Sequence, residues 1–250
     1  MSSAVNGAIV EAFQKRLVSS ATIMANMPAF DEAIDLSRRF GLLGRIGLHL
    51  NITEGPAMAS AIRCCRRFCD EMGGFRPRRT MLRLSRNESS AVEIEIEAQV
   101  RACLARGLNL THLDSHHHVH TEWAIGSAAI RVARRYGIVA IRLSRNCGPA
   151  INLSQRIYKS IFNDRLRLYG LAKTRFFGSG NDVQAILGKT SADIEVMVHP
   201  RRDANGVLVD LDGMDLQKKI RSLDIQDRMG NYEYKLRKGE RMSHSLPTQH

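Results

Sequence analysis

The fold and the chemistry of this 250-residue chain are decided by residues 111–120, Thr-His-Leu-Asp-Ser-His-His-His-Val-His. Five histidines and an aspartate lie within these ten residues, between a segment with the pattern of a buried strand and an amphipathic helix. Histidine is the commonest metal ligand and titrates near neutral pH, so the cluster predicts a metal or acid/base site. A low-complexity histidine tract is the alternative, but this one is internal and interrupted by Val119.

Strand periodicity divides the histidines into two groups. If residues 108–114 form a strand, His112 and Asp114 point to the same face, because alternate side chains share a face. Extending the same alternation places His116, His118 and His120 on the face of His112 and Asp114. It places His117 on the opposite face and predicts a structural role for it.

Composition and length limit the class of protein. The chain is 44% hydrophobic and 25% charged, as in ordinary globular proteins, and its length suits one α/β barrel or two small domains. No run of 18 apolar residues predicts a membrane span. Residues 1–7 lack the charged and apolar regions of a secretory signal, and five cysteines fit reduced thiols, so a cytoplasmic location is predicted.

The net charge of +12 is concentrated in two stretches. Residues 63–86 carry eight arginines against Asp70 and Glu71, and residues 156–175 carry six basic side chains against Asp164. Such patches attract nucleic acid, anionic membrane surfaces or acidic saccharides, or they are solvated faces. The sequence argues against nucleic-acid binding, because only two aromatic residues interleave with the first stretch.

Predicted strands alternate with predicted helices along the chain, which favours parallel βαβ units in a barrel or a doubly wound sheet. The predicted strands are 19–25, 45–50, 108–114, 139–143, 173–177 and 194–199; the main predicted helices are 4–14, 28–40, 90–106, 122–136, 154–171, 181–188 and 215–223. His49, Asp114, Arg142 and His199 fall at strand ends, where the active sites of barrels lie, so we expect a barrel with one active mouth.

Residues 1–224 are expected to form this single domain. Within it, residues 57–88 are predicted to be a basic insertion or lid with one helix at about 58–70. Residues 225–250 are polar and basic without apolar periodicity, which predicts a mobile tail.

Three motifs resemble, in order and spacing, the YdjC-like carbohydrate deacetylases, a family that includes chitooligosaccharide deacetylase. They are residues 47–55 (Gly-Leu-His-Leu-Asn-Ile-Thr-Glu-Gly), residues 111–120, and residues 195–200 (Glu-Val-Met-Val-His-Pro). The resemblance implies a distorted (β/α) barrel. It also implies a divalent metal ion, often Mg²⁺ or Zn²⁺, used to hydrolyse the acetamide of an N-acetylated sugar or oligosaccharide.

The resemblance carries two metal ligands onto this chain, His49 and His116. The third family ligand is an aspartate from an Asp-Asp pair that ends the first strand, and this chain opens just after the matching position. The first strand is therefore expected to be missing from this chain. Either the true start of the protein lies further upstream, or the gene has lost this strand. Because two histidines bind a hard cation poorly, the alternative is an inactive truncated member that only binds a saccharide or a metal.

Further roles follow from the resemblance and from residue chemistry. Asp114 is predicted to orient a ligand imidazole, and His199 to protonate the leaving amine. Contacts to the sugar are predicted for Thr53, Glu54, His118 and Arg142. Simpler alternatives are that Asp114 accepts backbone hydrogen bonds, that Arg142 forms an ordinary ion pair, and that His199 merely ends a strand.

Two features bear on partners. Arg201 and Arg202 follow the His-Pro pair where the family often has glycine, which suggests an anionic substrate. A homodimer is a further hypothesis.

Overall fold

Three short parallel strands form the central sheet, in the order β1 (Ala21–Ile23), β2 (Ile46–Leu50) and β3 (Leu113–Ser115). The structure is a computed structural model, and it describes residues 2–77, 83–148 and 152–232. Gly47 lets β2 and β3 approach closely, because a Cβ atom there would lie 2.4 Å from the carbonyl oxygen of His112. This register places His49 directly opposite Asp114.

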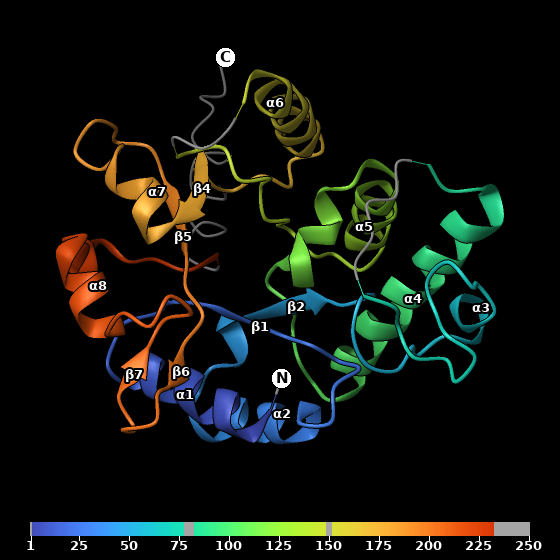
Figure 1. The fold of residues 1–250 in the computed structure, drawn as a ribbon, viewed down its shortest axis with the longest axis horizontal. Coiled ribbons are helices and arrows are strands. Elements are labelled where there is room, and N and C mark those ends of the chain that lie inside the picture. The colour runs from blue at the N-terminus through green and yellow to red at the C-terminus, as the bar shows by residue number, and fades with distance from the viewer. Residues whose placement is uncertain (1, 78–82, 149–151, 233–250) are drawn as a thin grey trace, which may run out of the picture.

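Helices cover the central sheet and bury its apolar side chains. Helices α1 (Ser3–Gln14) and α2 (Phe30–Arg39) lie side by side beneath β1 and β2 in Figure 1. Helix α4 (Arg86–Ala105) packs against β2 and against α5 (Trp123–Arg135). Its apolar residues at helical spacing are fully buried: Val92, Ile96, Val100 and Cys103.

The second half of the chain adds smaller elements around this core. Helix α6 (Leu153–Leu168) precedes a parallel pair, β4 (Phe176–Ser179) and β5 (Ile194–Met197), with α7 (Gly180–Gln184) between them. An antiparallel pair follows, β6 (Arg201–Arg202) and β7 (Leu208–Val209), and then α8 (Leu216–Ser222). The remaining short helices are η1 (Leu43–Arg45), α3 (Ser60–Arg63), η2 (His116–Thr121) and η3 (Gln226–Arg228).

The predicted α/β class with parallel strands is confirmed. Within the described ranges, the strands form separate small sheets and no closed barrel. The strand predicted at 139–143 is reduced to one bridge between Leu113 and Ile141. Leu113 donates to the carbonyl of Ala140 and accepts the N–H of Arg142, while the N–H of Ile141 bonds on the opposite side to the carbonyl of Leu171.

Two local predictions were wrong. Helix α4 begins at Arg86 rather than near 90, because Ser85 and Glu88 form its capping box while Glu93 pairs with Arg131 and Arg135. The helix predicted at 58–70 shrinks to α3, because three-residue turn bonds from Cys65 to Ile62 and from Phe68 to Cys65 follow it. The Asp70 carboxylate then accepts the N–H groups of Met72 and Gly74 in a further turn.

The structure describes only part of the predicted lid and part of the predicted tail. Residues 78–82 of the expected lid and residues 233–250 of the expected tail lie outside the described residues. Among the helices that the structure does describe, none is both long and apolar enough to cross a membrane.

Candidate active site

The centre of the candidate site is His49, on β2. Its Nδ1 lies 2.6 Å from Oδ1 of Asp114 and 3.1 Å from Oγ1 of Thr22. A carboxylate at that distance accepts the Nδ1 proton, which fixes the tautomer and leaves the lone pair on Nε2. The geometry leaves Nε2 of His49 available and places Asp114 beside the His49 ring, while their roles as metal ligand and orienting carboxylate stay predictions.

Asp114 is in turn held by a buried arginine. Its second carboxylate oxygen accepts from Nη1 of Arg142, whose Nε donates to Glu195 at 2.7 Å. Burial alone would raise the pKa of Asp114, but the charges of Arg142 and His49 hold that pKa well below its ordinary value. A chain of polar contacts from His49 through Asp114 and Arg142 to Glu195 thus connects β2 and β3 to β5.

The position of Arg142 bears on its predicted contact with sugar. The guanidinium lies over the ring of Phe177, 5.0 Å from its centroid, and is occupied by two carboxylates. This is the ion-pair alternative from the sequence, and it makes Arg142 part of the support of the site. A contact between Arg142 and sugar stays a prediction.

His116 is the second predicted ligand, and its ring centroid lies 5.7 Å from that of His49. Its Nε2 is 3.1 Å from Oε2 of Glu54, a side chain that is about half exposed. Burial, together with the neighbouring rings of His117 and His49, lowers the pKa of His116 to about 4. His116 is therefore neutral at neutral pH, as a metal ligand must be.

The strand parity predicted for the histidine run ends at Ser115. Residues 116–121 form the 3₁₀ helix η2, in which His117 and His118 have φ values of 51° and 56°. Left-handed backbone is costly for residues with a side chain, and such strain gathers at functional sites. The turn directs Nδ1 of His117 to within 3.1 Å of Oγ1 of Thr53, so His117 does not face away from the site.

The two ends of the run are structural. His112 stacks on Tyr232 at 4.0 Å between centroids and lies 2.8 Å from the Thr111 hydroxyl through Nδ1. His120 is fully buried, with Nδ1 2.6 Å from Oγ of Ser115 and Nε2 3.0 Å from the carbonyl oxygen of Arg142. The shared face predicted for the even-numbered histidines is wrong at His120, because η2 replaces the strand there.

A buried polar network that the sequence analysis missed fixes the loop after β2. The side chain of Asn51 accepts the N–H groups of Thr53 and Glu54 and donates to Asn26. Gln99 of α4 bonds both the N–H and the carbonyl of Asn51, and also Glu95. The available signal was the placement of Glu95 and Gln99, four residues apart, within the apolar stripe of α4.

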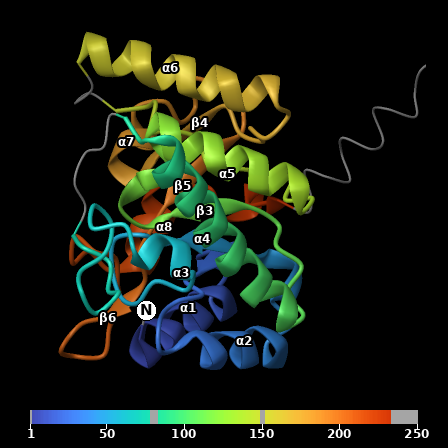
Figure 2. The same ribbon diagram turned by 90° about the vertical axis from the view of Figure 1, so that its right-hand side faces the viewer.

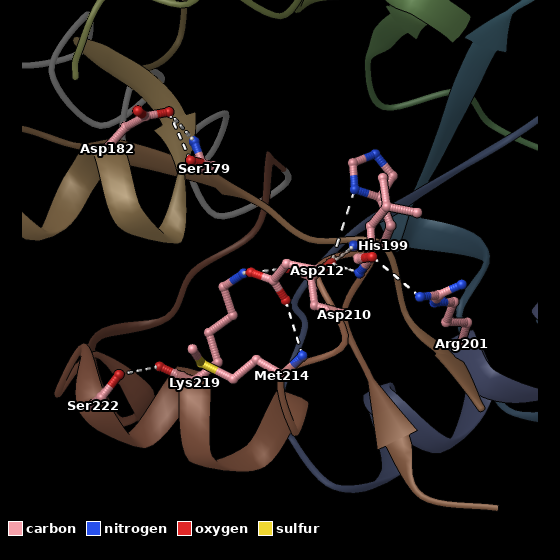
Figure 3. A network of polar contacts seen from close by, with 10 residues as sticks. Ser179, Asp182, His199, Arg201, Asp210, Asp212, Met214, Lys219 and Ser222 are labelled. Carbon is pink, nitrogen blue, oxygen red and sulfur yellow. Dashed lines mark hydrogen bonds and ion pairs between the residues drawn. The ribbon is translucent and has the colours of Figure 1, made fainter. Parts of the chain in front are cut away.

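His199 lies beside a second polar network, shown in Figure 3. Its backbone N–H donates to Oδ1 of Asp210 at 2.6 Å, and its ring Nδ1 is 3.9 Å from the same oxygen. Nζ of the buried Lys219 donates to both Asp210 and Asp212, at 2.6 Å each. Burial lowers the pKa of His199 and Asp210 opposes this, with smaller effects from Arg142, His49 and Asp114.

His118 completes the predicted set. Its ring makes an edge contact with Phe177, and burial lowers its pKa to about 4. Hydrogen bonds and ring contacts connect six of the predicted residues, with His117 as the link to Thr53: Thr53, Glu54, His49, Asp114, His116 and Arg142. His118 lies in η2, and His199 follows the end of β5.

The residues fit two positions of a metal site. The rings of His49 and His116 lie 5.7 Å apart between centroids, and the carboxylate of Asp114 is hydrogen-bonded to His49, as carboxylates are to many histidine ligands of divalent metals. No group of three histidine, cysteine, aspartate or glutamate side chains arranged to hold a metal occurs within residues 2–77, 83–148 and 152–232. The described residues therefore supply part of a ligand set.

Comparison with known proteins identifies the family. Residues 1–239 match the family described as YdjC-like protein. The chain belongs to the YdjC-like family. Among YdjC-like relatives, a carbohydrate deacetylase of Geobacillus stearothermophilus is 34% identical over 200 residues, which are 80% of this chain and 74% of that protein.

Other similarities are shorter or structural. A carbohydrate deacetylase of Brevibacillus brevis is 39% identical over 141 residues, which span about half of each protein (55% of this chain and 53% of the relative). A solved Enterococcus faecalis structure, described as a cellobiose-phosphate cleavage protein, superposes with a TM-score of 0.68 over 93% of this chain and 94% of that chain. At 20% identity, this likeness concerns the fold alone.

The buried histidines of this YdjC-like protein predict that the free energy of unfolding decreases as the pH is lowered. Burial lowers the pKa of both His112 and His120 to about 3, whereas an unfolded histidine titrates at about 6.5. Between these values the unfolded state binds more protons than the folded state. These two groups should therefore lower the free energy of unfolding by about 3 kcal/mol for each pH unit of acidification near pH 5.

Urea unfolding at several pH values between about 7.5 and 5 measures this slope. His120→Gln removes one titrating group and should reduce the slope by about 1.3 kcal/mol per pH unit, the contribution of one histidine. A free energy of unfolding that is flat across this range, or a slope unchanged in His120→Gln, would contradict the assignment.

Proposed function

We propose that this protein is a metal-dependent hydrolase that removes acetyl groups from N-acetylated sugars or oligosaccharides. The observation that carries the proposal is the Asp114–His49 pair with His116 beside it, since this arrangement presents two imidazole ligands. The carbohydrate deacetylases among the relatives support the substrate class. A distorted (β/α) barrel, a cytoplasmic location and a homodimer are parts of the proposal that rest on the sequence.

In this proposal His49 and His116 hold a divalent ion, Mg²⁺ or Zn²⁺, which when bound lowers the pKa of a water and polarises the amide carbonyl. Asp114 keeps the proton of His49 on Nδ1. Thr53 and Glu54, anchored by Asn51, lie at the edge of the site and contact the sugar with His118.

His199 donates a proton to the leaving amine nitrogen. Its lowered pKa makes the imidazolium a stronger acid, while the carboxylate of Asp210 opposes the shift and so favours the protonated form. The backbone bond to Asp210 positions His199 at the end of β5.

The test combines metal titration with acetate release from oligomers of N-acetylglucosamine. His49→Ala and His116→Ala should abolish calorimetric binding of Zn²⁺ or Mg²⁺ and the release of acetate. His199→Ala is the matched control, because it should keep metal binding and lose only activity. Metal binding without acetate release from any oligomer would instead assign the inactive binding protein.

Asp114→Asn tests the orienting carboxylate. An amide cannot hold the His49 proton as a carboxylate does, so metal affinity should fall about 10- to 100-fold. Calorimetry measures this change, and Asp35→Asn, at an exposed aspartate of α2, is the control. Equal affinities for Asp114→Asn and the unchanged protein would remove Asp114 from the site.

A further inference from the structure

Helix α6 carries an apolar stripe on its solvent face. Leu153, Ile157, Ile161 and Leu168 are between 53% and 88% exposed. Their spacing of four, four and seven residues places them along one side of the helix, within about 80° of arc at 100° per residue. The opposite side is used for packing, where Phe162 and Leu166 are fully buried.

Basic side chains border this stripe. Arg156 and Arg167 lie along one margin and Arg165 along the other, from the same helical geometry. The only acid of the helix, Asp164, falls within the arc of the stripe, and its carboxylate accepts from Nη1 of Arg167 at 2.6 Å, so an ion pair with the margin neutralises it. Residues 153–175 together carry six basic side chains against that one acid.

The helix stands at the outer edge of the molecule. Figures 1 and 2 both show α6 at the periphery, and in Figure 2 it lies above α5. Three half-exposed aromatic residues lie on or next to it, Trp123, Tyr158 and Tyr169. The guanidinium of Arg165 is 4.5 Å from the ring centroid of Trp123, which connects this aromatic residue to the margin of the stripe.

We propose that α6 docks the protein onto an anionic lipid surface. A helix with an apolar face, basic margins and nearby tryptophan and tyrosine has the features of helices that lie in the membrane interface. The basic margins attract the headgroups of anionic lipids, and the net charge of +12 adds a long-range attraction.

A second copy of the chain fits this surface less well. Two such helices would bring their arginine margins together, and four side chains of one helix cover far less than the roughly 800 Å² per partner of a stable interface. An acidic protein partner would need a groove to enclose a ridge that projects from the surface. The docking is independent of the proposed deacetylase activity.

The experiment is co-sedimentation of the full chain with vesicles of phosphatidylcholine alone or mixed with phosphatidylglycerol. We expect binding to the mixed vesicles, weakened by salt. Trp123 is the only tryptophan of the chain, so its fluorescence reports on this region and should shift to shorter wavelength on binding.

Two double variants separate the apolar and the charged contributions. Ile157→Ser with Ile161→Ser should weaken binding about tenfold or more, and Arg156→Gln with Arg167→Gln about 25-fold, at about fivefold per charge. These side chains are on the solvent face, so circular dichroism should show unchanged folding. Met72→Ser, at an apolar residue that is 93% exposed outside α6, is the control and should bind as the unchanged protein does.

Several results would overturn the proposal. They are no sedimentation with mixed vesicles, equal binding to both kinds of vesicle, and equal loss in Met72→Ser and the isoleucine variant. A concentration-dependent dimer that the isoleucine variant abolishes, without vesicle binding, would assign the stripe to self-association. Binding to an acidic peptide alone would assign it to a protein partner.

Discussion

Arg142→Met is expected to lower the free energy of unfolding by about 3–5 kcal/mol, because it leaves buried charges without their partner. Asp114 is 1% exposed and Glu195 is mostly buried, and both depend on the guanidinium of Arg142. Chemical denaturation measures the loss, which is a large part of the 5–15 kcal/mol typical of a domain. Arg39→Met, at an exposed position of α2, should change stability by less than about 0.5 kcal/mol.

The pH dependence of this effect has a defined sign. In the unchanged protein the lowered pKa of Asp114 contributes stability above the unfolded value of about 3.9, and that stability is lost as the pH falls toward the still lower folded value. Without Arg142, burial raises the pKa of Asp114, so protonation then favours the folded state. The stability difference between Arg142→Met and the unchanged protein should therefore shrink from pH 7.5 to pH 5.

A double variant tests the cause. If the unpaired Asp114 charge is the source of the loss, Arg142→Met with Asp114→Asn should be more stable than the two single changes added together. Strict additivity would place the effect in the packing of the arginine against Phe177 instead.

Lys219→Met is expected to have a similar effect, about 3–5 kcal/mol, at the network beside His199. Lys219 is 5% exposed and Asp210 is 4% exposed. The two form an ion pair, and Asp210 also accepts the backbone N–H of His199. Thermal or urea denaturation measures the loss. The neighbouring Lys218 is exposed on the same helix, so Lys218→Met is a matched control with a change within about 0.5 kcal/mol.

The paired change Lys219→Met with Asp210→Asn keeps this test decisive if the single variant does not fold. Neutralising Asp210 removes the buried, unpaired carboxylate, so part of the lost stability should return. Equal stability of Lys219→Met and Lys218→Met would show that the buried ion pair contributes little.

The sequence by itself determined the parts that depend on local periodicity and on motifs. The sequence predicted helices that overlap α1, α2, α5, α6 and α8, and a strand that overlaps β2 with His49 near its end. Asp114 was predicted to orient a ligand imidazole, and the β2–β3 register places it beside His49. The helices and the strand can be predicted because their patterns repeat within one or two turns of the chain, whereas the contact between Asp114 and His49 spans 65 residues and depends on the β2–β3 register.

Only the tertiary structure decided which histidines reach the site. The strand parity fails after Ser115 because His120 bonds to Ser115 and to the carbonyl oxygen of Arg142, which closes η2 and forces His117 and His118 into left-handed backbone. The partners of Arg142 come from β3 and β5, about 30 and 50 residues away. No local pattern encodes contacts of that range, so the sequence located the histidine run while long-range packing assigned each histidine its role.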